Sequence, residues 1–205
     1  MKKKSESYSR LIYAISRVII TRPTKFLFHM EIIGAENWPE HGPAILAANH
    51  SSNMDPPLVC LSYPGYISWM GKVEVLRAPV LGWYLKKVGA FEVRRGEADR
   101  EAIRRARELL DEGYVVGMFP EGSRQRDGHL GEALPGVGML ALTPGVPVIP
   151  VRIRGNDQIV RNGRLRRPKV TVTVGPPVDL EMPEMSKGKS YREASRRIMA
   201  AIEAL

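Results

Sequence analysis

Short apolar runs alternate with segments of helical periodicity from residue 44 to the end of the chain. The apolar runs predict strands at residues 44–48, 66–70, 90–93, 114–119, 146–153 and 169–174. Helical spacing predicts helices at residues 56–62, 73–87, 98–112, 132–143 and 191–205. Strand–helix alternation is typical of an α/β domain. We therefore predict a single layered domain whose mostly parallel or mixed central sheet is flanked by helices. Residues 169–174 alternate apolar and polar side chains, which places that strand half-exposed at a sheet edge.

The N-terminal segment combines basic residues with an amphipathic pattern. Its apolar side chains recur at helical spacing: Leu11, Ile12, Ile15, Val18 and Ile19. This run is shorter than the roughly 20 residues that cross a bilayer. The charged Arg17 within it makes the run a poor apolar core for a signal peptide. The helix could lie in the headgroup plane of an anionic membrane or dock on the core with its charges in water. We divide the chain into 1–35, an amphipathic membrane-associating segment, and 36–205, the α/β domain.

The net charge of +9 is concentrated in two places. Residues 1–25 and residues 152–169 each carry seven basic side chains against one acidic side chain. Such patches suit nucleic acid, an anionic membrane surface or a phosphorylated substrate. Residues 152–169 contain no aromatic side chain that could stack on a base. We therefore expect no nucleic-acid partner.

His50 and Asp55 follow the first predicted strand. A carboxylate that accepts a hydrogen bond from one imidazole nitrogen fixes the tautomer and raises the basicity of the other nitrogen. This is the arrangement of a general base acting on a hydroxyl. Alternatively, Asp55 only caps a helix that begins at Pro56.

Two further polar turns follow predicted strands. Glu121, Gly122, Ser123 and Arg124 come after the strand at 114–119. Backbone N–H groups, a hydroxyl and a guanidinium within one turn suit a phosphate monoester. Glu121 could orient the arginine or bind a substrate hydroxyl. Alternatively, the segment is a polar surface turn with an ion pair and no binding function.

Arg94 and Arg95 end the strand predicted at 90–93. Loops at one edge of an open α/β sheet share a crevice, so these arginines could converge with the other two polar loops. If they do, the crevice holds a phosphate and places a general base near a hydroxyl.

The residues that two classes of hydrolase require are missing from this sequence. The histidines are His29, His41, His50 and His129, and no two of them stand at metal-ligand spacing. No G-x-S-x-G elbow of a serine hydrolase is present either. We expect no bound metal and no acyl-enzyme nucleophile.

Four ordered segments resemble the motifs of the glycerolipid acyltransferase family, the lysophosphatidate (PlsC-like) acyltransferases. These segments are residues 50–55, 89–95, 119–124 and 146–151. The resemblance implies that His50 is the general base, that Asp55 orients it, and that Arg95, with Arg94 as a close competitor, binds the phosphate of the acceptor.

The third and fourth motifs extend the resemblance. It implies that the turn after residue 120 helps to bind the acceptor through Glu121, Gly122, Ser123 and Arg124. The apolar fourth motif around Pro147 and Pro150 would support the site or the acyl chain.

The sequence departs from the family pattern at three positions. Ser123 stands where threonine is common and keeps the hydroxyl, and Leu134 lies near a position where many relatives carry lysine. Glu92 occupies a usually apolar position and could alter the preference for the acceptor.

The resemblance implies transfer of a fatty acyl group from acyl-CoA or acyl carrier protein to the free hydroxyl of lysophosphatidate, giving phosphatidate without a cofactor. Another lysolipid or glycerol 3-phosphate is the alternative acceptor, and the alternative from a different class is a basic protein that binds nucleic acid or a membrane surface. A lipid substrate favours the membrane interpretation of residues 1–35. We therefore expect a peripheral or monotopic protein on the cytoplasmic face of the cell membrane. The patch at 152–169 could touch that membrane or receive an acidic acyl carrier protein.

Overall fold

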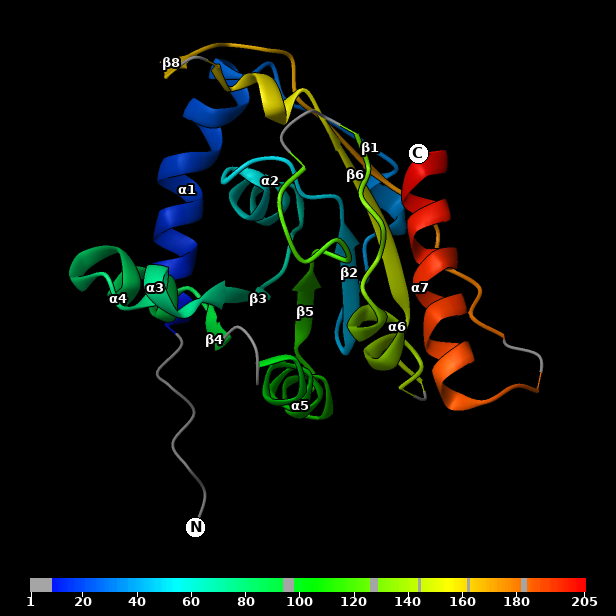
Figure 1. Cartoon of the computed structure of the whole chain (residues 1–205). Coiled ribbons are helices and arrows are strands. Elements are labelled where there is room, and N and C mark those ends of the chain that lie inside the picture. The colour runs from blue at the N-terminus through cyan, green and yellow to red at the C-terminus, as the bar shows by residue number, and fades with distance from the viewer. Residues whose placement is uncertain (1–8, 94–97, 126–128, 144, 162, 182–183) are drawn as a thin grey trace.

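The computed structural model describes residues 9–93, 98–125, 129–143, 145–161, 163–181 and 184–205 (Figure 1). Seven strands of these residues form one sheet in the order β1-β9-β6-β2-β5-β3-β4. Their bounds are β1 (Glu31–Ile33), β2 (Ala44–Ala48), β3 (Ile67–Lys72), β4 (Phe91–Val93), β5 (Val115–Met118), β6 (Val148–Arg154) and β9 (Thr171–Val174). The β6–β9 pair is antiparallel and the other neighbours are parallel. The predicted mostly parallel or mixed α/β sheet is confirmed.

Helices cover both faces of this sheet. One apolar cluster joins the strands to α2 (Asp55–Ser62) and to the end of α1 (Arg10–Leu27). A second cluster joins the other face to three helices, α5 (Ala98–Asp111), α6 (Pro135–Ala141) and α7 (Lys187–Ala204). The chain also forms α3 (Val73–Leu76), α4 (Pro79–Lys87), the 3₁₀ turns η1 (Ala35–Asn37) and η2 (Asn156–Gln158), and a hairpin of β7 (Val160–Arg161) and β8 (Arg164–Leu165).

The central strand β2 has apolar side chains on both faces, so helices must pack on both faces of the sheet. Ala44, Leu46 and Ala48 belong to the α2 cluster, whereas Ile45 and Ala47 belong to the α5–α7 cluster. Successive side chains of a strand point to opposite faces, and a strand buried on both faces reads as a continuous apolar run. This pattern is typical of a strand in the middle of a sheet, and the polar loop at 49–54 follows β2 directly.

The structure corrects the predicted edge position of residues 169–174. β9 lies inside the sheet, because β1 pairs with its outer side. β1 has only three residues, too few to show the period-2 pattern that identifies a strand. It also lies within the segment 1–35, so part of that segment belongs to the main sheet.

Three predicted helices have different bounds in the structure. The helix predicted at 132–143 is the shorter α6, Pro135–Ala141. The helix predicted at 73–87 is two helices, α3 and α4, separated at Ala78. Ala78 is extended (φ −60°, ψ 131°) because it precedes Pro79, which disfavours the helical conformation of the residue before it. The helix predicted at 191–205 begins earlier, at Lys187.

The N-terminal helix α1 turns its apolar stripe away from the core. Tyr13 and Thr24 are buried on the inner side, and the Tyr13 hydroxyl donates to the Gly65 carbonyl. On the outer side, Leu11 is 69% and Val18 is 74% exposed. The helix is therefore docked on the domain and still presents apolar side chains to the surroundings. No helix of the described ranges is long and apolar enough to cross a membrane.

Candidate active site

The polar loops that the sequence singles out lie at one edge of the sheet. β2, β5 and β6 are parallel neighbours, so their C-terminal ends meet at the same edge. From this edge come the loop at 49–54, the loop at 119–134 and the turn η2. The first two loops are joined directly, because the Gln125 N–H donates to the His50 carbonyl over 2.7 Å.

His50 and Asp55 form a hydrogen-bonded pair. The distance between His50 Nδ1 and Asp55 Oδ2 is 2.8 Å. The Asp55 side chain is fully buried, and that of His50 is 18% exposed. A carboxylate can only accept, so Nδ1 carries the proton and Nε2 is the nitrogen with a lone pair. The pairing that the spacing indicates is therefore present, with Nε2 as the atom available for a base.

Backbone and side-chain donors surround Asp55. Its Oδ2 also accepts from the backbone N–H groups of Ser51 (2.7 Å) and Ser52 (2.8 Å). Its Oδ1 accepts from Asn156 Nδ2 at 2.6 Å. The alternative of a helix cap does not hold, because Met54 is the N-cap residue of α2 and the carboxylate is turned back toward the loop. The network fixes the carboxylate against the imidazole.

Two asparagines missed by the sequence analysis hold this loop to β6. Asn156 is 2% exposed and donates to both Asp55 Oδ1 and Ser51 Oγ. Asn49 donates to the Ile153 carbonyl (3.0 Å) and accepts from the Ile153 N–H (2.7 Å). Asn156 stands in a Gly-Asn-Asp stretch that reads as an ordinary turn. Asn49 offered a better signal, since it is a polar residue directly after a fully apolar strand.

An aromatic stack supports the imidazole; it consists of Phe119, directly after β5, and Trp69 of β3. The His50 ring lies 4.0 Å from the Phe119 ring at an interplanar angle of 14°. Phe119 in turn stacks on Trp69 at 4.7 Å. Trp69 Nε1 donates to the Cys60 sulfur, and burial raises the pKa of the Cys60 thiol to about 11. The stack limits rotation of the His50 ring and leaves the cysteine an unreactive part of the packing.

Glu121 connects the loops through backbone donors. Its Oε1 accepts from the His50 N–H (2.9 Å) and its Oε2 from the Gly131 N–H (3.0 Å). The side chain is 5% exposed, and burial raises its pKa. Both oxygens are engaged inside the protein, so Glu121 positions the His50 backbone. Its predicted part in acceptor binding stays a prediction.

The turn after Glu121 places Arg124 beside the histidine loop. Gly122 has a φ of +63°, in the left-handed region that favours glycine. Ser123 is exposed. Arg124 Nη1 donates to the amide oxygen of Asn53 at 2.7 Å. Since that partner is neutral, this contact leaves the charge of the guanidinium uncompensated.

Several predicted residues lie elsewhere or outside the description. Arg94 and Arg95 fall outside the described residues. Pro150 is buried in β6 opposite Ala47, and the Pro147 carbonyl accepts from the Ile45 N–H. The fourth motif thus joins β6 to β2 below the polar loops. In the described ranges, no group of three or more His, Cys, Asp or Glu side chains is placed to hold a metal ion.

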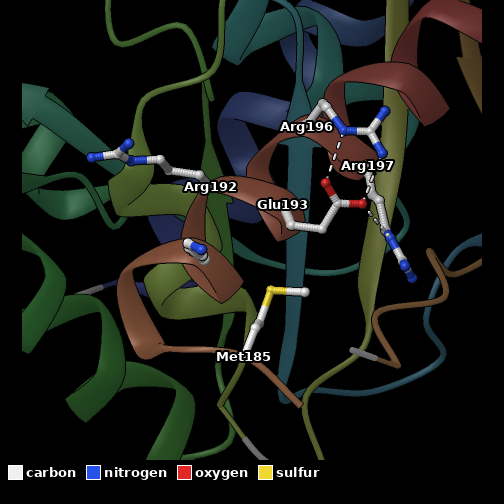
Figure 2. A pocket seen from close by; sticks show the side chains of 6 residues that line it. Met185, Arg192, Glu193, Arg196 and Arg197 are labelled. Atoms are coloured by element: carbon white, nitrogen blue, oxygen red, sulfur yellow. Dashed lines mark hydrogen bonds and ion pairs between the residues drawn. The ribbon is translucent and has the colours of Figure 1, made fainter. Parts of the chain in front are cut away.

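A hollow of about 360 Å³ lies on α7, away from these loops (Figure 2). Its lining consists of Met185, Lys189, Arg192, Glu193, Arg196 and Arg197. Figure 2 shows Arg196 and Arg197 on either side of Glu193. Their hydrogen bonds lower the pKa of Glu193 to about 2. None of the predicted site residues that the structure describes lines this hollow.

Comparisons with known proteins give the class. A sequence profile described as "Acyltransferase" matches residues 29–154. The chain is 31% identical over 139 residues to the 1-acyl-sn-glycerol-3-phosphate acyltransferase BAT2, chloroplastic, of Brassica napus, which covers 66% of this chain and 40% of that protein. It is 28% identical over 155 residues to the 1-acyl-sn-glycerol-3-phosphate acyltransferase of Pseudomonas aeruginosa, covering 74% of this chain and 60% of that one.

A solved structure shares the fold. The 1-acyl-sn-glycerophosphate (LPA) acyltransferase PlsC from Thermotoga maritima superposes with a TM-score of 0.68 at 26% identity, covering 93% of this chain and 81% of that chain. The fold and the His–Asp site at the strand ends define an α/β protein of the acyltransferase type. Because the family profile matches more than half of its residues, the chain belongs to the acyltransferase family. It spans less than half the length of the Brassica relative.

Proposed function

We propose that this chain is a 1-acyl-sn-glycerol-3-phosphate acyltransferase. It transfers a fatty acyl group from a thioester donor, acyl-CoA or acyl carrier protein, to the free hydroxyl of lysophosphatidate, and the product is phosphatidate. The observation that carries the proposal is the 2.8 Å contact between His50 Nδ1 and the buried Asp55 carboxylate, in a family whose relatives bear this name.

In the proposed mechanism, His50 acts as general base. Nε2 takes the proton of the glycerol hydroxyl while the oxygen attacks the thioester carbonyl. The resulting imidazolium is stabilised by the Asp55 carboxylate, which holds it in the correct orientation. When the tetrahedral intermediate collapses, the carbon–sulfur bond breaks and the thiolate takes the proton back from His50. One ester forms, one thioester is lost and no cofactor is consumed.

Arg124 and Arg95 are the proposed ligands of the acceptor phosphate. Arg124 hydrogen-bonds to Asn53, three residues after His50, so its guanidinium belongs to the same loop cluster as the base. A guanidinium donates two parallel hydrogen bonds to a phosphate. Holding the phosphate beside the base orients the free hydroxyl toward Nε2, and such positioning contributes several kcal/mol of rate enhancement.

We propose that the protein acts on its lipid substrates at the cytoplasmic face of a membrane. Support comes from α1, whose outward stripe of apolar residues is accompanied by exposed Arg10, Arg22 and Lys25. A basic amphipathic helix of this kind binds in the interface of anionic bilayers. Contact through one exposed helix face corresponds to a peripheral or monotopic arrangement.

A panel of donors and acceptors tests the function. Purified protein is incubated with fatty acyl-CoA or fatty acyl carrier protein, and thiol release is followed with lysophosphatidate, glycerol 3-phosphate or a lysophospholipid with a larger headgroup. The proposal predicts the highest kcat/KM with lysophosphatidate and phosphatidate as product. Thiol release that is independent of every acceptor, or faster with another acceptor, would overturn it.

A further inference from the structure

The β7–β8 hairpin exposes two aliphatic side chains on one face. Val160 of β7 pairs with Leu165 of β8, and cross-strand partners project to the same side. Val160 is 59% and Leu165 is 64% exposed. Single exposed apolar residues are common, but here two exposed aliphatic side chains lie opposite each other in the same hairpin.

Arginines adjoin this aliphatic pair along the chain. Arg164 precedes Leu165 in the strand β8, and Arg166 and Arg167 follow it. All three residues are exposed. In the preceding turn the nearest acidic residue is Asp157, which accepts a hydrogen bond from Gln158. Aliphatic groups flanked by guanidinium groups are the composition that anionic bilayer surfaces bind.

The base of the hairpin is fixed beside the C-terminal end of α1. Ile159 is 1% exposed and shares an apolar cluster with Phe28, the residue that caps α1. The Arg166 N–H donates to the Ile159 carbonyl, and the Val170 N–H donates to the Phe28 carbonyl. Figure 1 shows the hairpin projecting from this end of the helix. Phe26, in the last turn of α1, is 81% exposed.

We infer that the β7–β8 hairpin is a second membrane-contact element, which binds a bilayer containing anionic lipid. Val160 and Leu165 enter the interfacial region, while the three arginines bind phosphate groups of the lipids. The inference rests on the proposed function for its choice of a membrane over other acidic partners. Together with α1, the hairpin gives the protein two elements that contact the bilayer.

The small size of the hairpin favours a membrane over a protein partner. A stable protein interface buries about 800 Å² on each side, far more than two aliphatic residues supply. Insertion into a bilayer requires only a few apolar side chains together with basic residues, each of which contributes about fivefold in binding to an anionic surface. Binding of an acidic acyl carrier protein is therefore the alternative that the experiment must distinguish from binding of a membrane.

Flotation of the full chain with lipid vesicles tests the inference. The vesicles contain phosphatidylcholine with or without phosphatidylglycerol, at low and high salt. The charge variant replaces the exposed arginines of the hairpin: Arg164→Gln, Arg166→Gln and Arg167→Gln. The apolar variant carries Val160→Ser and Leu165→Ser. The control makes the same change of charge on the exposed side of α7, across the sheet: Lys187→Gln, Lys189→Gln and Arg192→Gln.

The charge variant is expected to lose more than about tenfold of its binding to the anionic vesicles, since three basic residues each contribute about fivefold. The control is expected to bind as the wild type does, and the apolar variant is expected to be weakened even at low salt. Equal losses in the charge variant and the control would overturn the inference. So would unchanged vesicle binding combined with a raised KM for acyl carrier protein, which would identify a protein-docking surface.

Activity with a short-chain, water-soluble lysophosphatidate separates this inference from the proposed function. Hairpin variants should keep the wild-type kcat in that assay, because Nε2 of His50 and the phosphate ligands are untouched. If the wild type is inactive both with the water-soluble lysophosphatidate and with lysophosphatidate in vesicles, the proposed function fails. The flotation result still decides whether the hairpin binds membranes. Circular dichroism of each variant establishes that its fold is retained.

Discussion

The exchange Asp55→Asn probes the charge of the buried carboxylate with little change of shape. Oδ2 accepts from three donors, the imidazole of His50 and the N–H groups of Ser51 and Ser52, whereas Oδ1 accepts from Asn156 alone. An asparagine would place its oxygen at the Oδ2 position and its amino group at the Oδ1 position. A flip of the Asn156 amide then restores the hydrogen bond, because its oxygen can accept from the new amino group and from the Ser51 hydroxyl. We therefore expect the variant to fold.

The loss of activity follows from the missing charge. Proton abstraction makes His50 an imidazolium, which Asp55 stabilises and asparagine does not. Replacing a hydrogen bond to a charged group by a neutral one costs about 1–2 kcal/mol. The Coulomb attraction between unit charges about 4 Å apart is about 4 kcal/mol at an effective dielectric constant of 20. We predict a decrease in kcat between about tenfold and about 10³-fold, with little change in the KM of the acceptor.

Thiol release at saturating acyl-CoA gives kcat, and thermal unfolding followed by circular dichroism verifies the fold. Asp55→Ala is the comparison, since it removes the acceptor for all four donors and should lower both kcat and the unfolding temperature. A folded Asp55→Asn protein with wild-type kcat would refute the reasoning, because the carboxylate charge would then have no part in the reaction.

Three further changes test individual contacts. Asn156→Ala leaves a buried oxygen of Asp55 without its donor, so it should lower the free energy of unfolding by about 1–3 kcal/mol and lower kcat without raising the acceptor KM, as urea titration and steady-state kinetics measure. Arg124→Ala should raise the acceptor KM by about 10–100-fold with a smaller effect on kcat, and an unchanged KM would exclude Arg124 from the phosphate site. Burial raises the pKa of Glu121 above its usual value of 4.5, so its contribution to stability is present in acid and is lost as pH rises through the folded pKa. The free energy of unfolding of the wild type minus that of Glu121→Gln should therefore fall as pH rises, and a difference that rises with pH would contradict the burial argument.

The sequence predicted the parts of the fold that repeat a strong local pattern. The apolar run at 44–48 matches β2 residue for residue, because a strand covered on both faces has no room for polar side chains. The helix predicted at 98–112 differs from α5 by one residue, since Gly113, with a φ of +83°, ends it. β1 was missed because its partner, β9, lies far away in the chain, and β7 and β8 were missed because two residues each are too few to show a period.

The candidate site could be predicted only in part for the same reason. His50 and Asp55 are five residues apart in one loop, so their spacing alone indicates a pair. Asn156 reaches Asp55 from 101 residues away, and its role depends on β6 ending beside β2. Glu121 is predicted as a site residue, yet its bond to the His50 backbone becomes evident only once β5 is placed next to β2.

The apolar stripe of α1 shows a limit of periodicity. Helical spacing identified Leu11, Ile15 and Val18 as one face, but it could not tell whether that face turns inward or outward. In the structure it is turned outward, because Tyr13 and Thr24 occupy the contact with the domain. An amphipathic pattern defines a face, and tertiary contacts decide what covers it.

The proposed mechanism depends on Nε2 of His50 being the base, and His50→Ala tests that directly. Its kcat for acyl transfer to lysophosphatidate is to be compared with that of the wild type, alongside the dissociation constant of the acceptor. We predict that kcat falls by about 10²–10⁴-fold while the acceptor still binds with its wild-type affinity. A variant that turns over at the wild-type rate would contradict the central claim.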